Sequence, residues 1–218
     1  MSVCQVPQES QAEVAPVLAG VFGMLALIMV IVRIWQRTMF KQGFGWDDGL
    51  IVAALLCAGP LNCIAFPMAT AGLGNDMWTI PFHNIKKIFK FLYVAEVFYM
   101  PAEALTQLSF LFFYLRVFQT PSIYGIAYTL VALSIGFGIS NTFVMIFQCT
   151  PVSFFWKGWT GQYAGTCIKI SIYSWYKAAM QIAMDLSIMS IPIRPLMGLS
   201  LTKAKKARIC LMFCAGFL

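Results

Sequence analysis

Charge is scarce in this sequence. Only 11% of its 218 residues are charged and 60% are hydrophobic, whereas soluble domains carry about 25% charged residues. So few charges cannot cover a soluble surface, and we expect a protein that crosses the membrane several times. The net charge of +7 does not indicate nucleic-acid binding, because the lysines and arginines flank apolar segments, as topology signals and headgroup contacts do.

Groups that do chemistry are also scarce. The single histidine, His83, and the lack of a clustered nucleophile motif argue against catalysis, and scattered cysteines argue against a zinc site. We therefore expect no enzyme activity, no metal and no cofactor. Met1–Pro16 contains no Lys or Arg, so it does not resemble a secretory signal, and the first apolar segment is expected to remain as a membrane helix.

Long apolar segments predict an all-α, polytopic transmembrane bundle. Segments of this kind can cross the roughly 30 Å hydrocarbon layer at about 1.5 Å per residue. Residues 1–16 are expected to form a short extracellular tail, and 17–218 the transmembrane domain. The expected helices cover residues 17–35, 49–71, 91–118, 123–147 and 172–193, with a sixth over 209–218. Because the last segment is too short to span, we expect a fragment that ends inside helix 6.

The segment 91–118 is the one around which we expect the others to pack. It is apolar and aromatic, yet it carries Glu96, Glu103 and Gln107. At about 100° per residue, Glu103 and Gln107 fall within roughly 20° of Glu96 on a helical wheel. Such a polar stripe should face protein or water rather than lipid.

Other polar side chains are candidates to meet this stripe. Segment 172–193 carries Lys177, Gln181 and Asp185 at spacings i, i+4 and i+8, and Asn62 follows Gly59-Pro60 in segment 49–71. With the stripe, these residues make a candidate ligand pocket. The alternative is that they only hold helices together by hydrogen bonds, and Lys177 could instead snorkel to the membrane boundary.

Charged residues at helix ends are candidates for cytoplasmic coupling. Asp47 and Asp48 precede segment 49–71, and Arg116 closes segment 91–118. The carboxylates could pair with Arg116 or simply cap their helix. Arg116 could contact a cytoplasmic transducer or anchor to phosphate headgroups.

Two observations set the expected orientation. Counting Lys and Arg on each side favours an outside N-terminus. Cys149 and Cys167 then share one outer loop, in a compartment where disulfides persist. We expect a disulfide between them, with two free thiols as the alternative.

Several short motifs in order resemble one family. They are Gly45-Trp-Asp-Asp48, Gly72-Leu-Gly74, Leu92-Tyr-Val-Ala-Glu96, Leu108-Ser-Phe-Leu-Phe-Phe-Tyr-Leu-Arg-Val-Phe118, Phe147-Gln-Cys-Thr-Pro-Val152 with Trp156, Gly165-Thr-Cys167, and Asp185 with Pro192. Together they resemble the fungal rhodopsin-like integral membrane proteins, a group that includes receptor-like proteins of appressorium-forming plant pathogens.

The resemblance implies a seven-helix receptor-like architecture in the plasma membrane. It also implies an unknown small-molecule ligand and a heterotrimeric G protein as partners, besides the lipid bilayer. Two positions depart from the family: Asp76 stands where a His is frequent, and Gln107 where a Lys is frequent. We do not expect retinal, because the Schiff-base lysine of retinal proteins usually lies in the last helix and Lys177 is badly placed for this role.

Three functional hypotheses remain at this point. The first is a G-protein-coupled sensor of an extracellular or membrane-borne ligand. The second is a transporter or proton-coupled carrier, which intramembrane acids and interrupted helices also suit. The third is a truncated remnant that does not signal.

Overall fold

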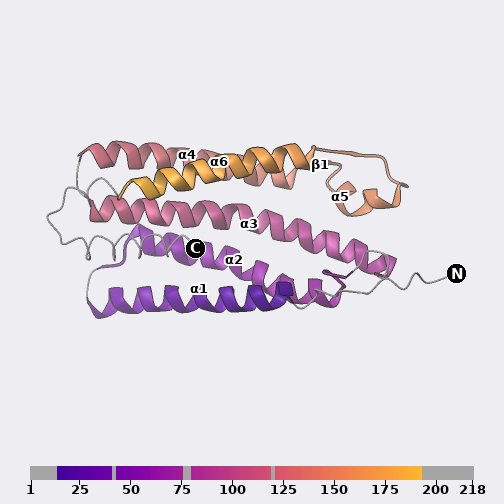
Figure 1. Ribbon diagram of the computed structural model, residues 1–218, viewed down its shortest axis with the longest axis horizontal. Helices are drawn as coiled ribbons and strands as arrows, with labels where there is room; N and C mark the ends of the chain where they lie inside the picture. Colours follow the sequence, from indigo (N-terminus) through magenta and orange to yellow (C-terminus); the bar gives the residue numbers. More distant parts are fainter. Residues whose placement is uncertain (1–13, 41–42, 76–79, 119–120, 193–218) are drawn as a thin grey trace.

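The computed structural model describes residues 14–40, 43–75, 80–118 and 121–192, which form an elongated helical bundle (Figure 1). Its helices are α1 (Val14–Met39), α2 (Trp46–Thr70), α3 (Phe82–Val117), α4 (Pro121–Ile146), the short α5 (Phe154–Lys157) and α6 (Ile170–Ser190). The all-α fold class is therefore confirmed. The expected sixth segment, 209–218, lies outside the described residues.

Helix α3 is the centre of the bundle. Figure 1 shows it between α1 and α2 on one side and α4 and α6 on the other, and it packs against α2, α4, α5 and α6. Its fully buried Leu111 and Tyr114 share one hydrophobic cluster with Leu130 of α4 and Ile188 of α6. Helices α2, α4 and α6 thus pack around this segment, as its sequence predicted, whereas α1 packs mainly on α2.

Among the described residues, three helices are long and apolar enough to cross a membrane: Val14–Met39, Trp46–Thr70 and Ile123–Ile146. The outer side chains of α1 remain accessible, with Phe22 59% and Met29 64% exposed, as a helix that faces lipid requires. Helices α3 and α6 are less apolar because they carry the polar residues that meet inside the bundle.

The start of α3 differs most from expectation. The helix begins at Phe82, so Lys86, Lys87 and Lys90 are helical rather than part of a loop. The reason is packing: Ile88 belongs to a hydrophobic cluster with Met68 and Ala71 at the end of α2. This contact stabilises the added turns. The other expected helix ends lie within four residues of the observed ones.

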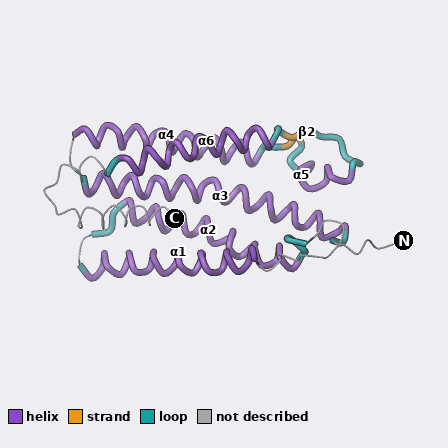
Figure 2. The backbone as a smooth tube through the Cα atoms, viewed as in Figure 1, coloured by secondary structure: helices purple, strands orange, loops and turns teal. Residues whose placement is uncertain are grey.

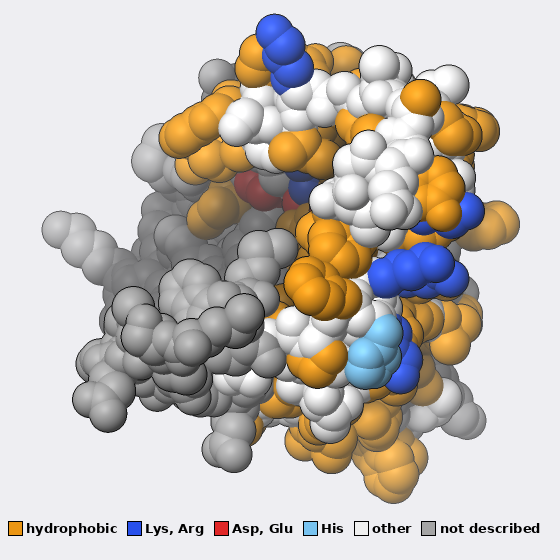
Figure 3. All heavy atoms as spheres, turned by 90° about the vertical axis from the view of Figure 1, so that its right-hand side faces the viewer, with side chains coloured by type: hydrophobic (Ala, Val, Ile, Leu, Met, Phe, Trp, Pro, Cys, Tyr) orange, Lys and Arg blue, Asp and Glu red, His pale blue; other side chains and the backbone are white. Residues whose placement is uncertain are grey.

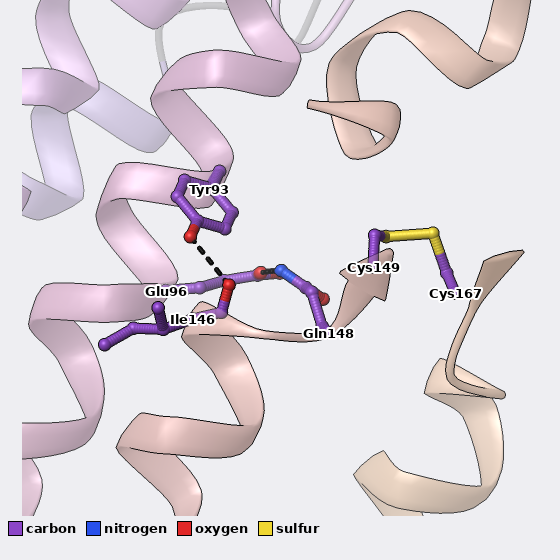
Figure 4. Close-up of a disulfide and its surroundings, with 6 residues drawn as sticks. All are labelled: Tyr93, Glu96, Ile146, Gln148, Cys149 and Cys167. Atoms are coloured by element: carbon purple, nitrogen blue, oxygen red, sulfur yellow. Dashed lines mark hydrogen bonds between the residues drawn. A yellow bond between two sulfur atoms is a disulfide. The ribbon is translucent and has the colours of Figure 1, made fainter. Parts of the chain in front are cut away.

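The connection between α4 and α6 is ordered by its own small sheet. Strand β1 (Cys149–Thr150) pairs antiparallel with β2 (Thr166–Cys167), and α5 and the 3-10 helix η1 (Gly158–Thr160) lie between them (Figure 2). A disulfide joins Cys149 to Cys167 across the pair (Figure 4). The expected disulfide is confirmed, although the sequence predicted only a loop around it.

Candidate ligand site and charged cluster

A hydrogen-bond network links α3, α4 and α6 inside the bundle. Gln107 Nε2 donates to Asp185 Oδ1 at 2.8 Å. Gln181, one turn before Asp185 on α6, donates to both carboxylate oxygens at 3.3 and 3.4 Å. The Ser134 hydroxyl of α4 donates to Gln107 Oε1 at 3.3 Å. Gln107 and Ser134 are 5% and 1% exposed, so the network is largely removed from solvent.

An ion pair forms a second link between α3 and α6. Lys177 Nζ lies 2.8 Å from Glu103 Oε2, and the two side chains are 14% and 18% exposed. The Tyr99 hydroxyl donates to Glu103 Oε1 at 3.2 Å, and Lys177 Nζ lies 4.5 Å from the Tyr99 ring centre. Lys177 is therefore an ion-pair partner of Glu103.

A cavity of about 440 Å³ opens beside these links. Its size falls in the range of about 300–1,000 Å³ that is typical of small-molecule sites. One wall is polar and formed by Tyr99, Glu103, Gln107, Gln181 and Asp185. The opposite wall is apolar and comes from α1 and α2, with Ala26, Val30, Ile51, Ala54, Leu55, Ala58 and Leu61. Four of the seven expected ligand residues thus line one cavity, and Lys177 contacts it through Glu103.

The end of the bundle at which α3 begins is shown in Figure 3. Acidic and basic side chains are visible deep in a hollow of this face, below hydrophobic side chains, and further Lys and Arg side chains lie at its periphery. The charged groups of the interior are therefore recessed from this surface.

The structure places Glu96 and Asn62 outside the cavity lining. Glu96 accepts a hydrogen bond from Gln148 Nε2 at 3.0 Å, close to the disulfide (Figure 4). Asn62 Nδ2 donates to Ala58 O at 3.1 Å, and its side chain lies against Gly23 of α1, where a Cβ would come within 2.8 Å of Asn62 Oδ1. The polar stripe of α3 is thus divided between two places, because Glu96 lies about 10 Å along the axis from Glu103.

A second charged cluster, the arginine–aspartate cluster, joins α1, α2 and α3 at the other end of the bundle. Arg33 contacts Asp47 at 2.9 Å and Asp48 at 3.0 Å. Arg37 contacts the same two carboxylates at 3.2 and 3.5 Å, and Arg116 at 3.3 and 3.7 Å. The aspartate side chains are only 2% and 0% exposed. Three guanidinium groups therefore surround two buried carboxylates.

Backbone contacts complete this cluster. The Gly45 N–H donates to Asp48 Oδ2 at 3.2 Å, and Ser109 of α3 donates to Asp47 O at 2.7 Å. Position 45 has no room for a side chain: a Cβ would lie 2.6 Å from Arg116 Nη1 and would also collide with the Asp47 carboxylate. Asp48 thus caps the start of α2, and both carboxylates contact Arg116, so the two alternatives from the sequence are not exclusive.

Sequence reasoning missed several of these groups. The sequence interpretation treated Arg33 and Arg37 only as topology signals. Their i, i+4 spacing places them on one helix face, and few residues separate them from Asp47, so a contact with Asp47 could have been predicted. Ser134 is one of several small polar residues in the apolar helix α4, and Tyr99 is one aromatic residue among many, so neither carried a signal. Within the described ranges, no three His, Cys, Asp or Glu side chains lie close enough to hold a metal ion.

The fold and its buried polar groups define a multi-pass α-helical membrane protein. The profile of the Fungal rhodopsin domain family matches residues 32–218, and the chain belongs to this family.

Two curated relatives show what the chain is similar to. One is a SAT4 family membrane protein of Emericella nidulans, 27% identical over 79% of this chain and 42% of the relative. The other is the Polyenoic acids biosynthesis gene cluster protein Ba17b of Metarhizium anisopliae, 25% identical over 92% of this chain and 55% of the relative. The chain thus spans about half the length of these relatives. No solved structure shows significant similarity to it.

Proposed function

We propose that the protein is a receptor-like sensor that binds a small ligand between α1, α2, α3 and α6 and signals to a heterotrimeric G protein. The observation that carries this proposal is the 440 Å³ cavity, which has one polar and one apolar wall. Ionisable groups inside a membrane are costly, and they are retained where they serve a function. Here two carboxylates line a space of ligand size.

We propose a plasma-membrane location with the N-terminus outside. Helix α1 begins at the end of the bundle that carries the β1–β2 disulfide (Figure 1), and disulfides persist on the outer side of that membrane. The arginine–aspartate cluster lies at the opposite end, and an excess of arginine favours the cytoplasmic side. A ligand would then enter the cavity from the extracellular side or from the lipid bilayer.

Helix α3 provides the route between the two ends. Glu103 and Arg116 are separated by 13 residues, or about 20 Å along one helix. A ligand that prefers one packing of α3 against α6 shifts the population toward that packing. The shift would reach Arg116 and change the arginine–aspartate cluster on the side where a G protein binds. Arg116, Asp47 and Asp48 are the proposed coupling residues.

The test is a small-molecule screen on cells that express the protein with a heterotrimeric G protein, read as GTP exchange. We expect ligands whose potency falls at least about tenfold in Glu103→Gln and Asp185→Asn, since each variant removes a charge from the cavity wall. Surface expression is measured for each variant, and Glu96→Gln serves as the matched control outside the cavity. Unchanged potency in both cavity variants contradicts the assignment of the site.

A carrier is the second candidate, favoured by the Glu103–Lys177 pair inside the bundle. A carboxylate and an amine in contact can exchange a proton when a substrate displaces one of them. Solute or proton flux in proteoliposomes that Glu103→Gln abolishes, without GTP exchange in cells, would favour the carrier over the receptor.

A further inference from the structure

The charges of the cavity wall are unequally matched. Glu103 and Asp185 both line the cavity. Glu103 has its counter-ion, Lys177, at 2.8 Å. Among the described residues, Asp185 accepts hydrogen bonds from two amides, Gln107 Nε2 and Gln181 Nε2. In the part of the chain that the structure describes, no lysine or arginine forms an ion pair with Asp185.

An unmatched carboxylate is costly at this place. Amide donors satisfy its hydrogen bonds but do not cancel its charge, and charge is expensive in the low-dielectric interior of a membrane protein. The contrast with the arginine–aspartate cluster is direct, since each aspartate there contacts three arginines. A counter-charge at Asp185 can come from a bound molecule.

The remaining lining sets the shape of that molecule. Across the cavity from Asp185, α1 and α2 present small apolar side chains, including Ala26, Ala54 and Ala58. This wall offers dispersion contacts and no hydrogen-bond donor or acceptor from its side chains. A complementary molecule has one cationic end and an apolar body.

We infer that the cavity binds an amphiphilic organic amine, whose protonated nitrogen pairs with the Asp185 carboxylate and whose apolar body packs on α1 and α2. Gln107 and Gln181 hold the carboxylate toward the amine, and the Glu103–Lys177 pair closes the polar wall. This inference rests on the proposed function, because it uses the same cavity, and it adds the chemical class of the ligand.

The experiment compares phenylalkyl amines with alcohols of equal chain length. The protein is placed in lipid nanodiscs, and binding of a radiolabelled 4-phenylbutylamine is measured, with amines and alcohols of two to eight methylene groups as competitors. We expect each amine to bind at least about thirtyfold more tightly than its alcohol, because truncating a partly buried charge pair typically costs that much. Asp185→Asn should remove this preference, while Asp185→Glu and Glu96→Gln should keep it.

The outcomes separate this inference from the proposed function. Equal binding of amines and alcohols, or a preference for amines that survives Asp185→Asn, overturns the ligand class and leaves a ligand cavity in place. Failure of every amine to bind also overturns it. A preference for amines that depends on Asp185, without GTP exchange in cells, supports the ligand class and counts against the receptor.

Discussion

The arginine–aspartate cluster and the polar wall of the cavity use similar side chains in opposite ways. At one end, two aspartates are almost fully buried and are contacted by three arginines from α1 and α3. In the cavity, and among the residues that the structure describes, Glu103 has one counter-ion and Asp185 is bound by two amides. The first arrangement is closed and compensated, whereas the second is open and incompletely compensated.

The difference indicates which region holds the helices together and which region gains from a bound ligand. A compensated cluster opposes separation of its helices, because pulling it apart leaves buried charges without partners. An uncompensated carboxylate beside a cavity gains from an incoming cation. We therefore expect substitutions in the cluster to act first on stability, with coupling through Arg116 lost as a consequence, and substitutions at Asp185 to act on ligand binding.

The largest effect is expected from Asp47→Asn combined with Asp48→Asn. The double variant removes both carboxylates and leaves three arginines close together, and breaking a buried ion pair typically costs about 3–5 kcal/mol. We expect little monodisperse protein by size-exclusion chromatography and a large fall in the midpoint of thermal unfolding. Glu96→Gln is the matched control, since in the described part of the chain Glu96 is bound by the Gln148 amide and forms no ion pair. Stability equal to that of the control would contradict the role given to the cluster.

The disulfide at the opposite end should have the next largest effect. Cys149→Ser with Cys167→Ser opens a closed loop whose ends are 18 residues apart, and such cross-links typically contribute about 2–4 kcal/mol. We expect the double variant to have a lower thermal midpoint than the wild-type protein. A reductant should lower the midpoint of the wild-type protein and leave that of the variant unchanged. If reductant also lowered the midpoint of the variant, the effect of reductant could not be assigned to the Cys149–Cys167 disulfide.

The sequence predicted the helical class and the central helix, because length and hydropathy decide both in a membrane. It predicted that Glu103, Gln107, Gln181 and Asp185 could meet, because polar groups in apolar helices must face inward. It did not separate Glu96 from Glu103. A helical wheel projects all residues along the helix axis, so it does not show that Glu96 and Glu103 are two turns apart.

The remaining misses have similar physical causes. The early start of α3 depends on contact between Ile88 and the end of α2, which no local pattern encodes. The partners of Asp47 and Asp48 on α1 depend on how α1 packs beside α2, which the local sequence does not determine. The apolar wall of the cavity consists of residues such as Ala54 and Ala58. In the sequence these residues are typical of any membrane helix, and only the packing of α1 and α2 opposite Asp185 makes them part of a cavity.

A smaller effect is expected from the Glu103–Lys177 pair. Glu103→Gln alone leaves the Lys177 ammonium without its counter-ion, whereas Glu103→Gln with Lys177→Met removes both charges. Contacting residues typically show coupling of about 0.5–3 kcal/mol, so the double variant should be more stable than the sum of the single variants predicts. The measurement is a double-mutant cycle on thermal unfolding in detergent. Additive effects would mean that this contact contributes little.

The smallest effect on stability is expected at Asp185. Asn at this position keeps an oxygen that can accept from Gln107 and Gln181, and it removes a charge that no lysine or arginine pairs with in the described residues. Loss of an unpaired charge from a low-dielectric site carries little penalty. We expect a change of less than about 1 kcal/mol in the free energy of unfolding, together with the loss of amine preference. A destabilisation as large as that of the Asp47–Asp48 double variant would mean that the charge of Asp185 is compensated within the protein. The cavity wall and the arginine–aspartate cluster would then not differ in how their charges are balanced.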